Sequence, residues 1–221
     1  MSDTNNTGLL REIDEELRQE RYSQLWTRYG KYVIIGAIIL VIGVAGYKGW
    51  EAHTFNNKIQ FSEEFYRGIS EYQAENVVAA EKSFMHLIDG SNVGHSMLAK
   101  FRLAASLVKQ GKTAQASENY LTLAANTSID KQYRELAKIL SVLLDIDTGD
   151  PEEIRQRLLP MLSDNNPWRF SALQLSGLIE TRSGDQMAAK KIFDRLISDP
   201  ETPQAIKSRT QELITAITEK D

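Results

Sequence analysis

The chain has 221 residues with no cysteine, which excludes disulfide and thiol chemistry and fits any compartment. This length holds one domain of ordinary size with extra segments, or two small domains. The net charge of −4 at pH 7 argues against broad nucleic-acid binding, because such binding depends on a basic surface.

Residues 1–31 precede the first apolar stretch. Within them, LLREIDEELRQERYSQLWTRYGKY predicts a helix with Leu10, Ile13 and Leu17 near one face. Acidic residues begin this helix and basic residues end it, which suits the helix dipole. Such a helix can dock on a cytoplasmic partner or lie on a lipid surface, and the sequence leaves both possibilities open.

Residues 32–50 form the predicted membrane-spanning helix. The uncharged part, residues 32–47, spans roughly 24 Å as a helix, which is short for a bilayer core of about 30 Å. Extension to residue 50 adds Lys48, which can snorkel to the headgroups. Aromatic residues typical of membrane interfaces flank the segment: Tyr29, Tyr32, Tyr47 and Trp50. These flanks favour a membrane helix over the alternative, a buried core helix.

The charges around this segment predict its orientation. The stretch before the segment is too long and too acidic for the start of a cleaved signal peptide. An uncleaved anchor is therefore the better interpretation. Residues 16–31 carry four lysines and arginines, and residues 48–63 carry two. This asymmetry places the N-terminus in the cytoplasm, with residues 51–221 translocated.

Past residue 60 a helix-turn-helix unit recurs. The turns are centred on residues 75, 111, 149 and 184, at separations of 36, 38 and 35 residues. In three of the four units a small residue comes seven before and five after the centre, and an aromatic residue comes nine after, as in tetratricopeptide repeats, whose period is about 34 residues. The sets are Gly68, Ala80 and Phe84; Ala104, Ala116 and Tyr120; Val142, Ile154 and Leu158; and Gly177, Ala189 and Phe193.

This pattern predicts an all-α fold, in which a single-pass membrane helix precedes a tetratricopeptide-like solenoid of helical hairpins. Residues 51–221 would hold about four helix pairs and a C-terminal capping helix. The third repeat departs from the pattern at both small positions, so we expect altered packing there.

Asp150 and Pro151 are typical of a helix start. A last helix after Pro203 would seal the final repeat with Leu213, Ile214 and Ile217.

The sequence supports binding rather than catalysis. Gly111-Lys112-Thr113 resembles the end of a phosphate-binding loop, but the required second glycine is replaced by Ser106 and a helix, not a strand, precedes it. The three histidines share no metal-ligand spacing, and an acidic cluster over residues 145–153 lacks the spacing of a calcium loop. We therefore expect no catalytic residue, cofactor, metal, nucleic acid or small-molecule substrate.

The candidate binding surface is the row of first helices of the repeats. Two recurring positions on this row are more apolar than a solvated face needs, and their residues are Phe65, Phe101 and Ile139, and Tyr72, Val108 and Ile146. The functional interpretation is an apolar groove that accepts extended or helical peptide. In the alternative interpretation, the last helix or a second copy of the chain fills the groove.

The order of these elements, with the stretch EELRQERYSQLWTRYGKYVIIGAIILVIGVAGYKGW, resembles the YfgM-like family of ancillary SecYEG translocon subunits, in its alphaproteobacterial branch. The resemblance implies a bacterial inner-membrane protein with a periplasmic repeat domain. It also implies that the protein lies beside the translocon and passes client chains to periplasmic chaperones. The family has no catalytic residues to carry over.

Two other functions fit the same elements. One is an organelle import receptor, anchored at its N-terminus, with a cytosolic repeat domain. The other is an envelope assembly or cell-division scaffold. Topology separates the receptor from the translocon subunit, and the charge asymmetry around residues 32–50 favours the latter.

Overall fold

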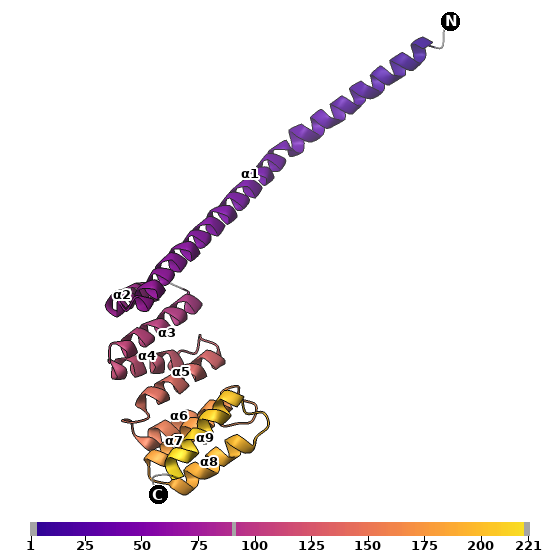
Figure 1. Cartoon of the computed structure of the whole chain (residues 1–221). Helices are drawn as coiled ribbons and strands as arrows, with labels where there is room; N and C mark the ends of the chain where they lie inside the picture. The colour runs from indigo at the N-terminus through magenta and orange to yellow at the C-terminus, as the bar shows by residue number, and fades with distance from the viewer. Residues whose placement is uncertain (1–3, 90–91, 219–221) are drawn as a thin grey trace. The chain divides into compact units, whose positions relative to one another are not determined.

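The structure is a computed structural model that describes residues 4–89 and 92–218. Its regular elements over those ranges are helices (Figure 1), so the predicted all-α class is confirmed. The chain divides into two compact units, Met1–Ile59 and Gln60–Asp221.

Helix α1 (Thr4–Gln73) is continuous and 70 residues long. Its part from Trp26 onward is the one helix among the described residues that is long and apolar enough to cross a membrane. The apolar side chains described between Ile34 and Trp50 are exposed, so this segment is not a buried core helix of the chain. The apolar face predicted for residues 1–31 concerns side chains outside the described residues. The boundaries at residues 31 and 50 stay predictions.

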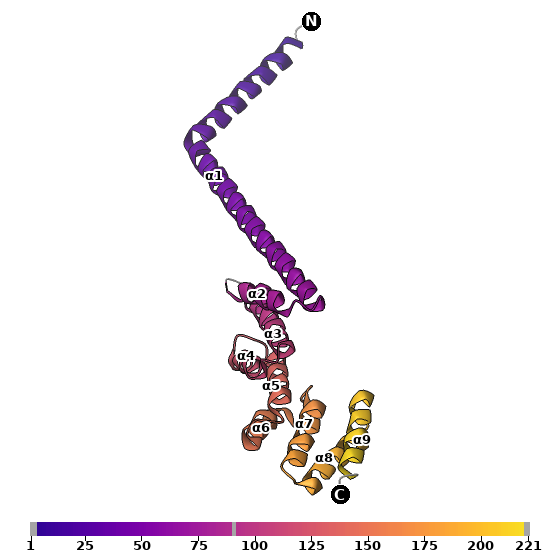
Figure 2. The ribbon, with the colours of Figure 1, turned by 60° about the vertical axis from the view of Figure 1, so that its left-hand side comes forward.

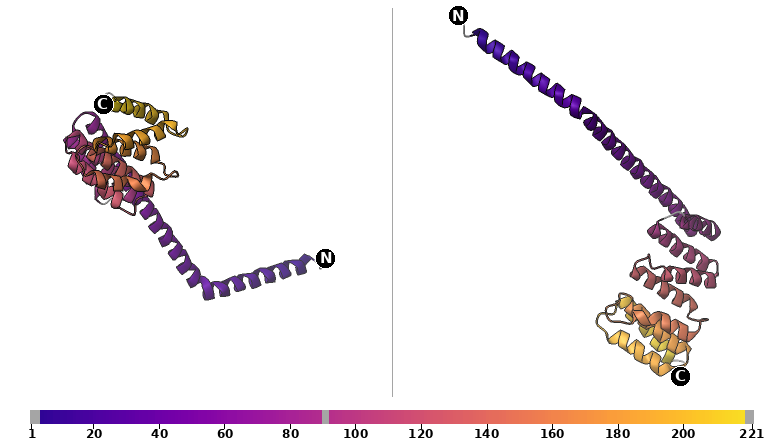
Figure 3. Two further views of the ribbon diagram at one scale, coloured as in Figure 1. Left: turned by 90° about the horizontal axis from the view of Figure 1, so that it is seen from below. Right: turned by 180° about the vertical axis from the view of Figure 1, so that it is seen from behind.

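The unit Gln60–Asp221 is a succession of antiparallel helical hairpins. Figures 2 and 3 show neighbouring helices of this unit following one another in chain order. The end of α1 pairs with α2, and each later pair repeats this arrangement. The helices after α1 are α2 (Val77–Ile88), α3 (Val93–Lys109), α4 (Thr113–Ala125), α5 (Lys131–Asp145), α6 (Pro151–Leu158), the 3-10 helix η1 (Leu159–Met161), α7 (Arg169–Arg182), α8 (Gln186–Ser198) and α9 (Gln204–Thr218).

The turns inside the hairpins lie where the sequence predicts them. Glu75, Gly111 and Gly184 adopt positive φ angles of 64°, 73° and 82°, the left-handed conformation that ends many helices. Glycine takes this conformation without steric penalty, whereas Glu75 carries a Cβ there. Gly111-Lys112-Thr113 is thus a turn between two helices, and Lys112 pairs with Glu81 at 3.3 Å rather than being simply solvated.

The small and large residues of the repeat meet as predicted. A Cβ built on Gly68 would lie 2.7 Å from the Phe84 ring, and one on Gly177 would lie 2.3 Å from the Phe193 ring. Both phenylalanines are fully buried. The first helix of each of these repeats therefore approaches the second so closely that the aromatic ring occupies the space of a missing side chain.

The third repeat has a shortened second helix, as its sequence suggests. Val142, Ile154 and Leu158 are fully buried, so the register holds. However, α6 has only eight residues, where α4 has 13. Pro160 explains the early end, because proline lacks the N–H of a helix interior and clashes with the preceding turn. The chain continues as η1 and then as an irregular loop to α7.

The caps and the last helix complete the unit. Asp150 Oδ1 accepts a hydrogen bond of 3.0 Å from the backbone N–H of Glu153, which confirms the predicted helix start. Helix α9 begins just after Pro203. The side chains predicted to seal the final repeat, Leu213, Ile214 and Ile217, pack against a core cluster formed by Leu173, Ala189, Phe193 and Leu196.

Gly177→Ala should destabilise the protein by about 1–3 kcal/mol, because the added methyl group overlaps the buried Phe193 ring. The matched control is Gly94→Ala in α3, where a Cβ meets its nearest atom at an ordinary 3.4 Å. Alanine favours helix, so this control should be neutral or stabilising by up to about 1 kcal/mol. Thermal melting of the full-length variants by circular dichroism measures both effects. Equal melting of the two variants would contradict the close helix approach.

Candidate protein-interaction surface

The last helix covers the inner face of the fourth repeat. Gln174 occupies there the position of Phe65, Phe101 and Ile139, and it is only 7% exposed. Its Nε2 donates a hydrogen bond of 3.1 Å to Thr210 Oγ1 of α9. Over the fourth repeat, the row of first helices is therefore covered by α9 rather than open.

Phe65 and Phe101 are half-buried against the large residue of their own repeat. The Phe65 ring centroid lies 5.7 Å from that of Phe84, and the Phe101 centroid lies 5.9 Å from that of Tyr120. Burial raises the pKa of Tyr120, so this phenol stays neutral beside the Phe101 ring. Both phenylalanines contribute to the packing of their hairpins.

The other predicted binding residues differ in exposure. Ile139 is 8% exposed and packs with the core of the third repeat, against which Ile146 also packs. Tyr72 is partly buried, and the Lys109 ammonium lies 4.5 Å from its ring centroid. Val108 is 39% exposed. Of the six predicted residues, Val108 therefore presents the most solvent-accessible side chain, and binding by the set stays a proposal.

Sequence reasoning missed further apolar side chains that reach solvent from the first helices. On α3 and α5 they include Val93, Leu98, Tyr133 and Leu143. These residues do not share one repeat position with Val108, so the repeat register gave no signal for them. Together with Val108 they provide exposed apolar area on two successive first helices.

Two basic residues link successive repeats and were also missed. Lys109 Nζ donates to the Tyr72 carbonyl oxygen at 3.2 Å and pairs with Glu75 at 2.6 Å. Arg182 donates to the carbonyl oxygens of Ile146 and Gly149 at 2.6 and 2.5 Å. Both residues lie two positions before a turn centre, and both reach the preceding turn, whose carbonyl groups lack helical partners. The sequence signal that could have revealed these links is a basic residue two positions before the turn centre in the second and fourth repeats.

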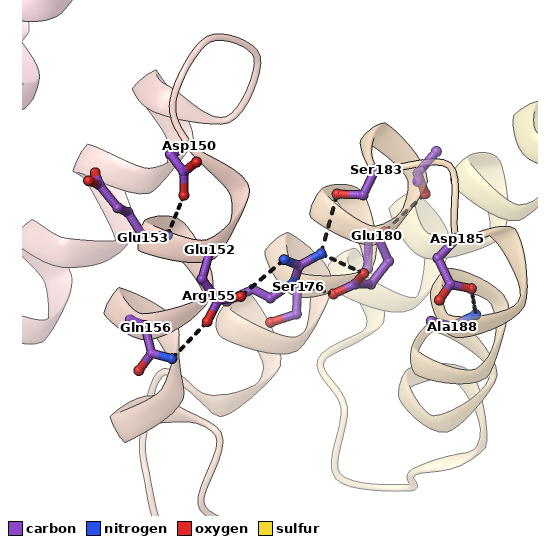
Figure 4. Close-up of polar contacts among 12 residues, drawn as sticks. Asp150, Glu152, Glu153, Arg155, Gln156, Ser176, Glu180, Ser183, Asp185 and Ala188 are labelled. Carbon is purple, nitrogen blue, oxygen red and sulfur yellow. Dashed lines mark hydrogen bonds and ion pairs between the residues drawn. The ribbon is translucent and has the colours of Figure 1, made fainter.

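Arg155 joins the short α6 to α7 (Figure 4). Its Nε and Nη2 donate to the two carboxylate oxygens of Glu180 at 2.8 and 2.9 Å, and Nη2 also reaches Ser183 Oγ at 3.3 Å. The Glu180 hydrogen bond raises the pKa of Arg155 above its ordinary value. A bidentate pair of this kind fixes direction as well as distance. It therefore orients α6 in the repeat where helix packing is least extensive.

The described residues offer no metal centre. Among the side chains that the structure describes, no three of histidine or acidic residues are grouped so that they could hold a metal ion. The carboxylates near the third turn act in caps and ion pairs instead: Asp150 caps α6, and Asp145 pairs with Arg157.

A double-mutant cycle should measure the strength of the Arg155–Glu180 pair. Arg155→Gln and Glu180→Gln should show a coupling of about 0.5–1 kcal/mol, because the pair is bidentate and partly buried. The control pair Arg195–Asp164, whose side chains are well exposed, should show coupling near zero. Unfolding in urea at low and high salt gives both values. Equal coupling in the two cycles would mean that Arg155 does not fix α6.

The comparisons with known proteins agree with this architecture. The family model of the tetratricopeptide repeat-like domain matches residues 23–215. The chain is also 21% identical over 183 residues to an ancillary SecYEG translocon subunit of Aggregatibacter actinomycetemcomitans, across 83% of this chain and 88% of that protein. No solved structure matches.

The match and the fold point to a protein that interacts with other proteins. The apolar helix near the N-terminus and the translocon-associated relative together indicate membrane association. Because the family model covers well over half of the chain and its repeats have the expected helical hairpins, the chain belongs to the tetratricopeptide repeat-like domain family.

Proposed function

We propose that the chain is a membrane-anchored interaction subunit of the Sec translocon that links it to periplasmic chaperones or client chains. The observation that carries the proposal is the similarity to an ancillary SecYEG translocon subunit along most of both chains. A membrane helix followed by a repeat array suits such a role, because the array can hold partners close to the translocon. Membership of the alphaproteobacterial branch stays a prediction.

Residues 32–50 would anchor the protein in the bacterial inner membrane. Four basic residues before this segment against two after it support a cytoplasmic N-terminus. Residues 1–31 would then lie in the cytoplasm and residues 51–221 in the periplasm. An import receptor with a cytosolic repeat domain would need the same anchor with its repeats on the opposite side.

The proposed partner surface is the row of first helices N-terminal to the part that α9 covers. Val108 and Leu143 supply exposed apolar side chains there. Phe101 of α3 packs against the core cluster of the first two repeats and so helps to hold α3 in place. In this arrangement the exposed residues would contact a peptide, while residues such as Phe65, Phe101 and Ile139 set the position of the helices.

Full-length protein with a C-terminal tag, purified from membranes in mild detergent, should bring the translocon subunits with it. Val108→Glu should lower the recovery of chaperones or client chains, because a charge on an apolar contact must be desolvated on binding. The matched control is Gln115→Glu, which adds the same charge at an exposed site of α4. Both variants should melt like the parent. Recovery of envelope-assembly or division proteins without the translocon would overturn the proposal.

Protease added to spheroplasts should digest the repeat domain and leave a protected fragment of about residues 1–50, as expected for an N-terminus held in the cytoplasm. Lysed cells are the control, because both sides of the membrane are then accessible. Protection of the whole repeat domain in intact spheroplasts would contradict the periplasmic location and favour the import-receptor alternative.

A further inference from the structure

A buried carboxylate interrupts an apolar position of the repeat. Fourteen residues before the four turn centres lie Phe61, Met97, Glu135 and Phe170. Phe61, Met97 and Phe170 pack against core clusters of their own repeats. Glu135 is only 5% exposed. Burying a carboxylate is unfavourable unless other groups compensate its charge, so this residue needs an explanation beyond packing.

Glu135 is held in a fixed orientation by a neighbouring amide. Asn166, 6% exposed, donates from Nδ2 to Glu135 Oε2 at 3.0 Å. The Asn166 Oδ1 atom accepts from the backbone N–H of Trp168 at 2.8 Å, which sets the direction of the amide. The ammonium of Lys131, whose side chain is exposed, lies 3.6 Å from Glu135 Oε1. A carboxylate accepts about four hydrogen bonds, so these contacts do not exhaust its capacity.

The carboxylate lines an open cavity of about 420 Å³. The cavity lies between the start of α5 and the loop over residues 162–168, which follows the shortened α6. Its lining residues include the acidic Asp130 and Glu135 and the polar Gln132 and Ser163. The early end of α6 at Leu158, just before Pro160, thus has a second effect, because the loop that follows supplies one wall of the cavity.

The preceding repeat has a smaller cavity at the corresponding place. A shift of 38 residues, the distance between turn centres 111 and 149, places Met97 on Glu135 and Val93 on Lys131. That cavity has a volume of about 140 Å³, and its lining combines Val93, Met97 and Leu123 with Ser96, Lys100 and Asn126. The two cavities share a place in the repeat and differ in volume and in charge. The third repeat therefore has a larger cavity, with Asp130 and Glu135 in its lining, where the second repeat has Lys100.

We propose that the Glu135 cavity binds a single cationic side chain, that of arginine or lysine, from a partner polypeptide. The inference rests on the proposed protein-interaction role. The two carboxylates outnumber the one ammonium of Lys131 in the lining, and the volume falls within the range of ligand pockets. The incoming cation donates to Glu135 Oε1 and displaces Lys131 into solvent. Charge-assisted hydrogen bonds of this kind are short and strong.

Calorimetric titration of the full-length protein in detergent tests the proposal. The probe is an acetylated and amidated alanine peptide with one central arginine, and its neutral twin carries citrulline instead. The arginine peptide should bind about tenfold more tightly, because only the cation pairs with Glu135. Glu135→Gln should remove this preference, since glutamine keeps the acceptor for Asn166 but loses the charge. Glu118→Gln, at an exposed site of α4, is the matched control and should change nothing.

The variant Lys131→Gln should change binding of the arginine peptide in the opposite direction from Glu135→Gln. Removal of the competing ammonium should tighten binding of the arginine peptide severalfold and leave the citrulline peptide unchanged. If Lys131 is instead the permanent partner of Glu135, this variant lowers the melting temperature without improving binding, and the proposal is overturned. Equal binding of the two peptides by the parent protein also overturns it. This second variant decides the question even if Glu135→Gln fails to fold.

The titration is independent of translocon recovery from membranes. Equal binding of the two peptides by a parent protein that still recovers the translocon subunits rejects the cavity proposal alone. Arginine-selective binding by a protein that brings no translocon subunits rejects the translocon role alone.

Discussion

The repeat domain depends on the close approach of two helices at positions where a side chain is missing. At Gly68 and Gly177 an aromatic ring from the second helix occupies the place of the Cβ. This contact sets the distance inside the hairpin, and the turns at Glu75 and Gly184 then reverse the chain within a few residues. Lys109 bonds the second hairpin, and Arg182 the fourth, to the turn of the preceding hairpin. The array is thus built from local contacts, each repeated at the next unit.

The third repeat shows the effect of a change in that contact. Val142 and Ile154 replace small residues, and α6 ends after eight residues. The loss of helix contact is offset by polar links, above all the bidentate bond between Arg155 and Glu180. The loop after α6 then forms a wall over Glu135. A departure from the repeat pattern has produced both a polar helix junction and the acidic cavity.

The fold could be predicted from the sequence because its determinants are local. Turn residues and small–large spacing depend on neighbours within one hairpin, and both Gly111 and the Gly68–Phe84 pair lie where the pattern placed them. The surface was harder to predict. Phe101 and Val108 occupy regular positions, but their exposure depends on side chains from other helices. Glu135 looked like an ordinary helical carboxylate, because its burial arises from a loop about 30 residues later in the sequence.

Helix α9 determines what kind of surface the C-terminal end of the repeat array presents. An array of hairpins is open-ended, because each unit leaves an apolar face that the next one covers. Leu213 and Ile217 cover that face at the C-terminal end, while Ser208, Arg209 and Glu212 point charged or polar groups to solvent. A second molecule therefore meets a hydrated surface there instead of a continuing core. Helix α9 thus acts as a cap on the fourth repeat, and its polar outer face disfavours the stacking of a further hairpin there.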